Sequence, residues 1–189
     1  MLSEHKLALS LKTLDNASAA EKPVLEKALA QVGFIPNMYT GMANSPGLLN
    51  TYLDGYAAFR QDSGFDSVEQ EVVFLTISKV NGCSYCMAAH SFLADAKSKV
   101  PGEVTDAIRD GNEIADGKLA ALSEFTKIMV EKRGLPSRVD VAAFIGAGYG
   151  ERQILEIILA ISVKTISNYS NHLFHTTVDE VFAGRTWED

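Results

Sequence analysis

The sequence is poor in cysteine, in positive charge and in long apolar runs. Its 189 residues include two cysteines, five prolines and one tryptophan, and its net charge is −7. No stretch approaches the ~18 to 20 consecutive apolar residues that a membrane-spanning helix requires. No basic cluster is present, whereas nucleic-acid binding depends on lysines and arginines that neutralise phosphates. We therefore expect a protein that neither spans a membrane nor binds nucleic acid.

The beginning of the chain lacks the features of an export signal. Glu4 and Lys6 are charged, and the apolar stretch at 7–9 is too short for a signal-peptide core. The expected location is therefore the cytoplasm, where the reducing environment disfavours structural disulfides. Because two cysteines cannot staple a chain of this length, a catalytic or metal-binding use of the pair is favoured.

Signals for helix starts and ends recur along the whole chain. Ser18–Glu21 and Ser67–Gln70 look like capping boxes, and Ser45-Pro46 looks like an N-cap followed by a first-turn proline. Residues 72–80 are apolar and β-branched and would permit a strand, but the preceding capping box favours a helix. The helices expected from these signals cover residues 24–32, 46–60, 67–80, 83–97, 101–110, 118–133, 137–146 and 151–168 or beyond.

We expect these helices to form a single domain. No alternating-period strand, exact repeat or long linker stands out, so we predict one all-α, multi-helix bundle over residues 1–189. Residues 1–16 are expected to form a short helix or a docking arm. The runs at 72–80 and 154–166 are apolar on more than one face. Helices of that kind are buried in a core or a subunit interface, so we also expect a homo-oligomer.

The candidate catalytic residues lie between about residues 67 and 97. Cys83 and Cys86 form a C-x-x-C pair, His90 lies four residues after Cys86, and Glu71 lies twelve residues before Cys83. At ~100° per helical residue, Cys83, Cys86 and His90 share one face. The spacing places Cys86 in contact range of His90 and brings the two cysteines within disulfide reach.

This arrangement is suited to peroxide reduction. Cys83 is expected at a helix N-terminus, where backbone N–H groups favour a thiolate, and His90 could exchange a proton with Cys86. One sulfur would become a sulfenic acid, and the other would condense with it to give a disulfide and water. If the helices on either side of Asn81-Gly82 fold back on one another, Glu71 would approach the thiols. There, a buried carboxylate would have a raised pKa and could shuttle protons.

The motif resembles the alkylhydroperoxidase D-like branch of the carboxymuconolactone decarboxylase superfamily. That pattern is a Glu, a C-x-x-C and a His four residues on, here Glu71, Cys83, Cys86 and His90. Weaker likeness to the peroxidase-related subgroup extends over 33–37, 44–46 and 171–175. The best-known members carry an additional His between the cysteines, where this chain has Ser84-Tyr85. Tyr85 there could be a hydrogen-bonding phenol, but a packing role under a neighbouring subunit is favoured.

The resemblance carries expectations about fold, roles and partners. It implies an all-helical fold and homo-oligomers, often trimers or hexamers. It implies a hydroperoxide substrate, with Cys86 as the peroxidatic sulfur, Cys83 as the resolving one, and Glu71 and His90 as a proton relay. No bound cofactor is implied, since electrons arrive from an external dithiol or a lipoyl-type carrier. The decarboxylase branch typically lacks the cysteine pair, so decarboxylation is not implied.

Two other interpretations remain open at this stage. The pair could act in a non-enzymatic redox sensor or interaction protein whose disulfide is a switch. Alternatively, Cys83, Cys86 and His90 could be three zinc ligands, with a fourth from Glu71 or from the pair His172 and His175. No further cysteine is present, so a closed structural zinc site is disfavoured. A thioredoxin-type enzyme is also disfavoured, because the C-x-x-C does not follow a strand in a βαβ pattern.

Overall fold

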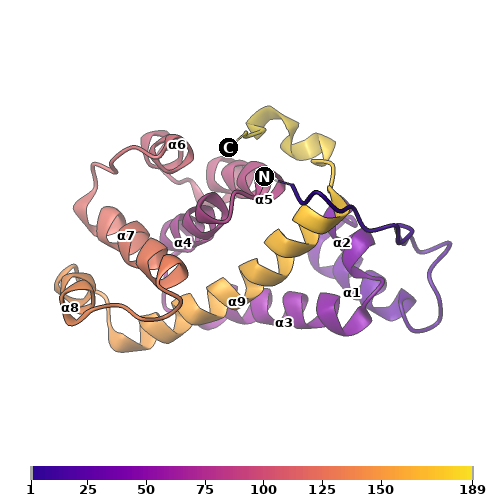
Figure 1. Ribbon diagram of the computed structural model, residues 1–189, viewed down its shortest axis with the longest axis horizontal. Helices are drawn as coiled ribbons and strands as arrows, with labels where there is room; N and C mark the ends of the chain where they lie inside the picture. The colour runs from indigo at the N-terminus through magenta and orange to yellow at the C-terminus, as the bar shows by residue number, and fades with distance from the viewer. Residues whose placement is uncertain (1, 189) are drawn as a thin grey trace.

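The computed structural model describes residues 2–188, which fold into helices and loops without a strand (Figure 1). Met1, the first residue of the expected arm, and Asp189 lie outside the described residues. A π-helical turn, η1 (Ala94–Ser98), extends α5, and a 3-10 helix, η2 (Glu180–Arg185), lies in the C-terminal segment. The α-helices are α1 (Lys22–Val32), α2 (Asn37–Met42), α3 (Pro46–Asp62), α4 (Ser67–Val80), α5 (Ser84–Leu93), α6 (Gly102–Asp110), α7 (Gly117–Glu131), α8 (Arg138–Gly146) and α9 (Glu151–Phe174). The all-α prediction is confirmed.

The capping signals place most helix starts correctly. Pro46 lies in the first turn of α3, and Ser137 opens α8 with a capping box, as predicted. Helix α4 has the predicted range, but the predicted capping box is one residue late, because Asp66 rather than Ser67 is the N-cap and accepts from the Glu69 N–H at 2.9 Å. The Ser18 N–H donates to the Glu21 carboxylate, but this contact closes a turn that precedes the helix. Helix α1 itself begins at Lys22. The sequence analysis missed α2, which has six residues and no side-chain cap.

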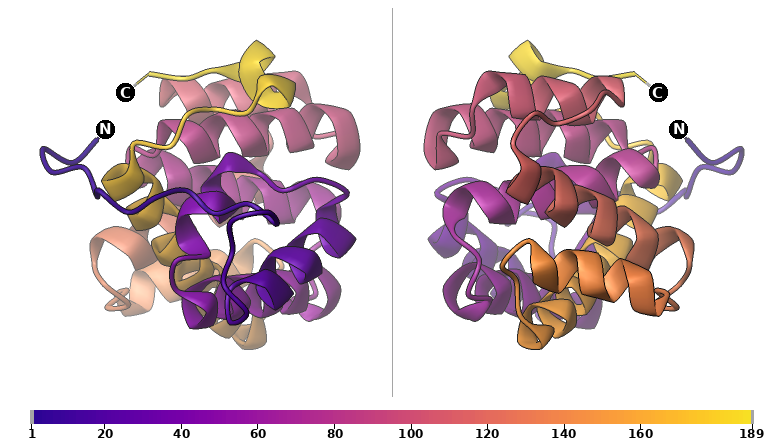
Figure 2. Two further views of the ribbon diagram at one scale, coloured as in Figure 1. Left: turned by 90° about the vertical axis from the view of Figure 1, so that its right-hand side faces the viewer. Right: turned by 90° about the vertical axis from the view of Figure 1, so that its left-hand side faces the viewer.

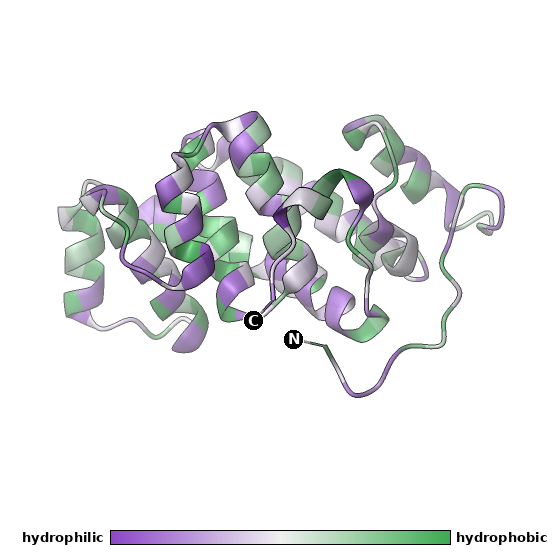
Figure 3. Ribbon diagram, turned by 90° about the horizontal axis from the view of Figure 1, so that it is seen from above, coloured by the Kyte–Doolittle hydropathy of each residue, from purple (hydrophilic) through white to green (hydrophobic). Residues whose placement is uncertain are grey.

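Helix α4 lies at the centre of the bundle. It packs against α5, α6, α7 and α9, and its residues 69–78 are all buried. A helix covered on every side needs no polar face, which explains why its sequence could be mistaken for a strand. The outer helices carry both hydrophobic and hydrophilic residues, as Figure 3 shows. The predicted core role of the 72–80 run is therefore confirmed.

Helix α9 crosses the molecule and joins two hydrophobic clusters (Figure 1). Its first half contributes Ile157 and Ala160 to a cluster around α4, α7 and α8, and Val163 belongs to a second cluster around α1, α2, α3 and α5. The approach to α3 is close at Gly55, where an added Cβ would lie 2.9 Å from Val163 Cγ2. This packing fixes the face that α9 turns toward α5.

The C-terminal segment returns over α5 and α6 (Figure 2). Helix η2 packs against α5, where the Phe182 ring lies 5.5 Å from that of Phe92. The indole N–H of Trp187 donates to the Arg109 carbonyl at 3.0 Å, so the segment is also tied to α6. Among residues 2–188, no helix has the length and apolarity needed to cross a membrane.

Candidate active site

The turn between α4 and α5 brings the C-x-x-C pair into the core. Gly82 adopts φ 62°, a left-handed conformation that glycine tolerates, and the Cys83 N–H then bonds to the Ser78 carbonyl at 3.0 Å. Cys83 is the N-cap of α5 and Cys86 lies in its first turn. Both cysteines are free thiols, 1% and 2% exposed. The predicted helix start at Cys83 is confirmed, and α4 and α5 do fold back on one another.

The hairpin brings Glu71 to His90. The Glu71 Oε2 lies 2.8 Å from His90 Nδ1, and its Oε1 accepts from Arg60 Nη2 at 2.5 Å and from Ser98 Oγ at 3.3 Å. Glu71 is 1% exposed, and burial alone would raise its pKa. The bonds and charges of His90 and Arg60 outweigh burial and hold that pKa below its ordinary value. The predicted raised pKa is therefore wrong, and Glu71 is an ionised carboxylate that fixes the orientation of its neighbours.

His90 is held as a neutral imidazole. Burial, together with the positive charge of Lys164, lowers the pKa of His90 to about 4 despite the adjacent Glu71. Because the ionised Glu71 faces Nδ1, the proton of the neutral ring belongs on Nδ1 and the lone pair on Nε2. The ring is clamped by Phe74 and Tyr56, whose centroids lie 4.8 Å and 6.4 Å away. His90 is thus a fixed base whose Nε2 can receive and return a proton.

The two thiols have opposite tendencies to ionise. The hydrogen bond to Cys86, together with burial, raises the pKa of the Cys83 thiol well above its ordinary value. Burial would also raise the pKa of Cys86, but the Cys83 thiol and the charge of Lys164 bring it well below that value. The expectation that the helix N-terminus makes Cys83 the thiolate is therefore wrong. Of the two thiols, Cys86 is the one whose pKa the site lowers.

The sequence analysis missed the residues that α9 and α3 add to the site. The Asn171 side-chain N–H group lies 3.4 Å from Cys86 Sγ, and the Cys86 thiol lies 3.9 Å from Ser167 Oγ. Arg60 comes from the last turn of α3, and Lys164 from the middle of α9. A signal for α9 was present, since polar residues recur at helical spacing through an Ile- and Leu-rich helix. Arg60 had no comparable signal.

An apolar cavity of about 320 Å³ opens onto Cys86 and His90. Its walls are mainly aromatic and come from α2, α3, α5 and η2: Tyr39, Tyr52, Tyr56, Tyr85, Phe92 and Phe182. The Tyr85 hydroxyl donates to Asp179 Oδ2, and that carboxylate also accepts from the Asn37 N–H at 3.0 Å. Tyr85 is thus a hydrogen-bonding phenol that ties the C-terminal segment to the cavity wall. A cavity of this character suits a small apolar molecule.

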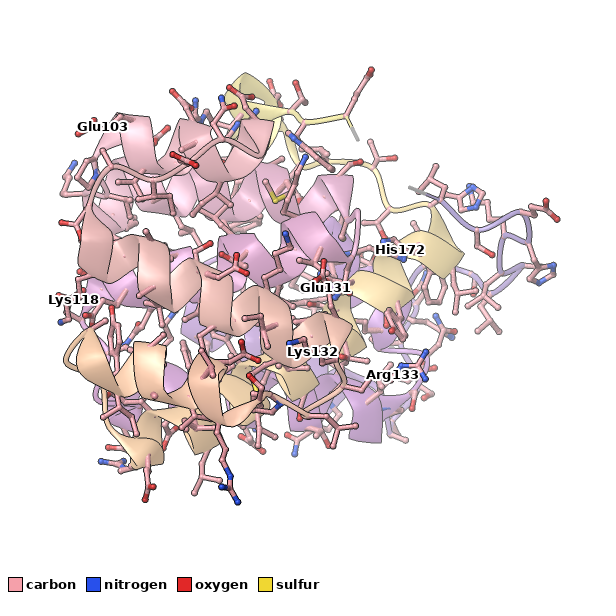
Figure 4. The ribbon with its side chains drawn as sticks, turned by 60° about the vertical axis from the view of Figure 1, so that its left-hand side comes forward. Glu103, Lys118, Glu131, Lys132, Arg133 and His172 are labelled. Atoms are coloured by element: carbon pink, nitrogen blue, oxygen red, sulfur yellow. The ribbon has the colours of Figure 1, made fainter. Side chains whose placement is uncertain are left out.

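The structure gives no support to a metal site. Across residues 2–188, no three or more His, Cys, Asp or Glu side chains are grouped as metal ligands. His172 lies near the C-terminal end of α9 (Figure 4), where its ring stacks on that of Tyr169 at 6.3 Å. His175 is the C-cap of α9, and its Nε2 lies 2.8 Å from the Ser3 carbonyl. The proposed His172/His175 ligand pair therefore has other contacts.

Comparison with known proteins places this geometry among related folds. Residues 46–127 match the carboxymuconolactone decarboxylase family model. An uncharacterised peroxidase-related protein from Ralstonia eutropha JMP134, described as an alkylhydroperoxidase AhpD core, is 18% identical with a TM-score of 0.80, over 95% of this chain and 97% of that one. A peroxidase-related protein from Silicibacter sp. TM1040 is also 18% identical with a TM-score of 0.77, over 97% of each chain.

A third structure has another activity. The debrominase Bmp8, in a cysteine-to-alanine variant bound to 2,3,4-tribromopyrrole, is 15% identical with a TM-score of 0.75, over 95% of this chain and 96% of that one. Among curated protein sequences, none matches this chain. At such low identity these likenesses establish a shared fold over nearly the whole chain.

Proposed function

Because residues 46–127 match the carboxymuconolactone decarboxylase family model and the fold is shared with alkylhydroperoxidase-like proteins, we propose that this chain is a thiol-dependent peroxidase. The observation that carries the proposal is the position of Cys86. Its sulfur has a pKa well below the ordinary value, because the Cys83 thiol and Lys164 outweigh burial, and it lies at an apolar cavity. Its partner thiol Cys83 is one turn away, and the neutral base His90 lines the same cavity.

The first step forms the sulfenic acid. The Cys86 thiolate attacks the terminal oxygen of a hydroperoxide ROOH, so an S–O bond forms while the O–O bond breaks and RO⁻ leaves. The leaving alkoxide needs one proton, which is the proton that Cys86 released on ionising. His90 Nε2 relays that proton, while Glu71 holds the opposite side of the ring at 2.8 Å. Glu71 is therefore a positioning residue in this step.

The second step joins the two sulfur atoms in a disulfide. Cys83 keeps its proton while Cys86 is ionised, because the bond to Cys86 and burial raise its pKa. Once Cys86 carries the sulfenic acid, Cys83 attacks that sulfur, loses its proton and expels water. The resulting disulfide must be reduced by two electrons. We propose that an external dithiol or a lipoyl-type carrier supplies them through thiol–disulfide exchange.

Peroxide consumption with a dithiol reductant tests this proposal. Wild type is compared with Cys86→Ser, and cumene hydroperoxide is compared with hydrogen peroxide. Turnover that disappears with Cys86→Ser and prefers the apolar hydroperoxide supports the assignment. The absence of turnover with every hydroperoxide, while the disulfide still forms and is reduced, would instead favour the redox-switch interpretation.

Reductive dehalogenation is a second candidate, favoured by the aromatic walls of the cavity and by the fold shared with a debrominase. In that reaction Cys86 would take the bromine from a ring carbon, which receives a proton. Cys83 would then displace bromide and form the disulfide. The overall change consumes two thiols and releases bromide. Bromide release from a bromopyrrole, in the assay that shows no peroxide loss, would replace the peroxidase proposal with this one.

We also propose that the chain assembles into a homo-oligomer through the outer face of α9. Leu155, Ile158 and Tyr169 lie on this helix and are 65%, 45% and 55% exposed. Apolar residues on one face of a long helix are typical of a subunit interface. A trimer or hexamer by light scattering at micromolar concentration is expected. A monomer under these conditions would contradict the proposal.

A further inference from the structure

Helix α9 carries a stripe of buried polar side chains on its inner face. Lys164, Ser167, Asn168 and Asn171 recur at helical spacing and are 0% to 2% exposed, whereas apolar Leu155 on the same helix is 65% exposed. This stripe departs from an ordinary amphipathic helix, whose buried face is apolar. Burying four polar groups opposes folding unless each has a partner, so the stripe needs an explanation beyond packing.

The stripe meets the two thiols. Asn171 Nδ2 lies 3.4 Å from Cys86 Sγ and 3.8 Å from Cys83 Sγ, and Ser167 Oγ lies 3.9 Å from Cys86 Sγ. Lys164 lies one turn before Ser167 on the same face, and it lines the cavity that holds Cys86. The polar face of α9 is therefore the wall that faces the reactive sulfur.

Lys164 is the member of the stripe without an assigned partner. Its side chain is fully buried, and Nζ has no hydrogen-bond partner among residues 2–188. The aromatic ring of Phe74 lies 5.7 Å from Nζ, which gives only a weak attraction for a cation. A buried ammonium requires a negative charge nearby. The reactive thiol that shares its cavity wall can supply one.

The other charges of the site are already matched. The carboxylate of Glu71 is paired with the guanidinium of Arg60 at 2.5 Å, and His90 is neutral at pH 7 because burial lowers its pKa to about 4. Lys164 and Cys86 are then the remaining pair, one positive and one negative when the thiol is ionised. The buried site is electrically balanced only with Cys86 as a thiolate.

We propose that Lys164 is the counter-charge of the Cys86 thiolate, and that Ser167 and Asn171 complete a cradle around the sulfur. This inference deepens the proposed function, on which it rests, by assigning thiol activation to α9 rather than to His90. Lys164 does not react itself; it is a positioning residue that acts by stabilising the negative charge of the Cys86 thiolate.

The electrostatic surroundings of Cys86 agree with this assignment. After burial and the Cys83 thiol, the charge of Lys164 is the next influence on the pKa of Cys86, and it lowers that pKa. The titratable groups that influence Cys86 or line its cavity come from α2, α3, α5, η1 and α9: Tyr39, Tyr52, Tyr56, Cys83, Tyr85, His90, Lys97 and Lys164. Lys164 is the buried cation in this set, since Lys97 is exposed, the tyrosines are neutral acids and His90 is a neutral base.

Titration of the Cys86 thiol tests the inference without any peroxide. In a Cys83→Ser background, the rate of alkylation by iodoacetamide and the thiolate absorbance are followed against pH. Lys164→Met keeps a buried side chain of similar length and removes the charge. We expect the titration midpoint to move to higher pH and alkylation at pH 7 to slow by about tenfold. Lys127→Met, which removes an exposed lysine of α7, is the matched control and should leave the titration unchanged.

An unchanged titration in Lys164→Met, with a folded circular dichroism spectrum, would overturn the inference. Should Lys164→Met fail to fold, Lys164→Gln provides the same test with a polar end group. Asn171→Leu is expected to shift the midpoint in the same direction by a smaller amount. Because alkylation does not depend on turnover, a shifted midpoint in a protein that consumes no peroxide would refute the peroxidase proposal and leave this one standing.

Discussion

Helices α5 and α9 face each other across the reactive sulfur, and they differ strongly in how their functional residues are distributed along the sequence. Helix α5 presents Cys83, Cys86 and His90 within eight residues, whereas α9 presents Lys164, Ser167 and Asn171 more than seventy residues later. The first group supplies the reacting atoms, and the second supplies charge and hydrogen bonds to them. The sequence motif thus identifies the reactive cysteine, while the residues packed around it determine how readily its thiol ionises.

The largest expected effect is the loss of the reacting sulfur itself, rather than of the residues around it. Cys86→Ser removes the nucleophile of α5, so we expect peroxide consumption to fall by at least ~1,000-fold. Cys83→Ser is the matched control, since it should still consume one equivalent of peroxide before stopping. The measurement is the stoichiometry of peroxide lost per protein without reductant. Equal loss in the two variants would contradict the assigned order of the cysteines.

Removal of the proton relay comes next in size. His90→Ala removes the base, and we expect kcat/KM to fall by about 100-fold. Glu71→Gln keeps a side chain that can contact the ring but removes its charge, and about a tenfold loss is expected. Steady-state rates are measured well below the Tm of each variant, because breaking a buried pair also destabilises the fold. A Glu71→Gln effect larger than that of His90→Ala would mean that Glu71 does more than position the ring.

The neutral state of His90 should make the fold sensitive to acid. Its pKa is about 4 in the folded protein, below the ordinary 6.5, because of burial and Lys164. The unfolded chain therefore binds more protons between these values, and the free energy of unfolding falls as the pH drops. From pH 7.5 to pH 5, we expect this residue to account for a loss of about 2 kcal/mol.

Urea unfolding at the two pH values measures that loss. Both cysteines are replaced by serine, so that thiol ionisation does not contribute. His90→Gln in this background should lose less stability between the two pH values than its parent. An equal loss in both would show that the acid sensitivity arises elsewhere, with Glu71 the first alternative.

The smallest expected effect concerns the segment that closes the cavity. Tyr85→Phe removes the hydroxyl that donates to Asp179, and we expect a loss of about 1 kcal/mol in stability. The C-terminal segment should also be cleaved faster in limited proteolysis. Thr51→Val, which removes an exposed hydroxyl of α3, is the control. Identical stability and cleavage in both variants would show that the Tyr85–Asp179 bond does not hold the segment.

The sequence predicted the fold better than the electrostatics of the site. The signal at Ser45-Pro46 and the predicted start at residue 137 placed the beginnings of α3 and α8, because such signals are local. The pKa direction of Glu71 could not be predicted, because it depends on Arg60, which only the packing of α3 against α4 brings near. The identity of the ionised cysteine likewise depends on Lys164, whose position is set by the close packing of α9 on α3.

The most direct test of the central claim is the mass of the protein after reaction with one equivalent of cumene hydroperoxide. The reduced Cys83→Ser variant should gain one oxygen, located on Cys86 by peptide mapping. The wild type should lose two hydrogens as the Cys83–Cys86 disulfide forms. If neither mass changes while both thiols remain open to alkylation, Cys86 is not a peroxidatic cysteine and the proposed function is wrong.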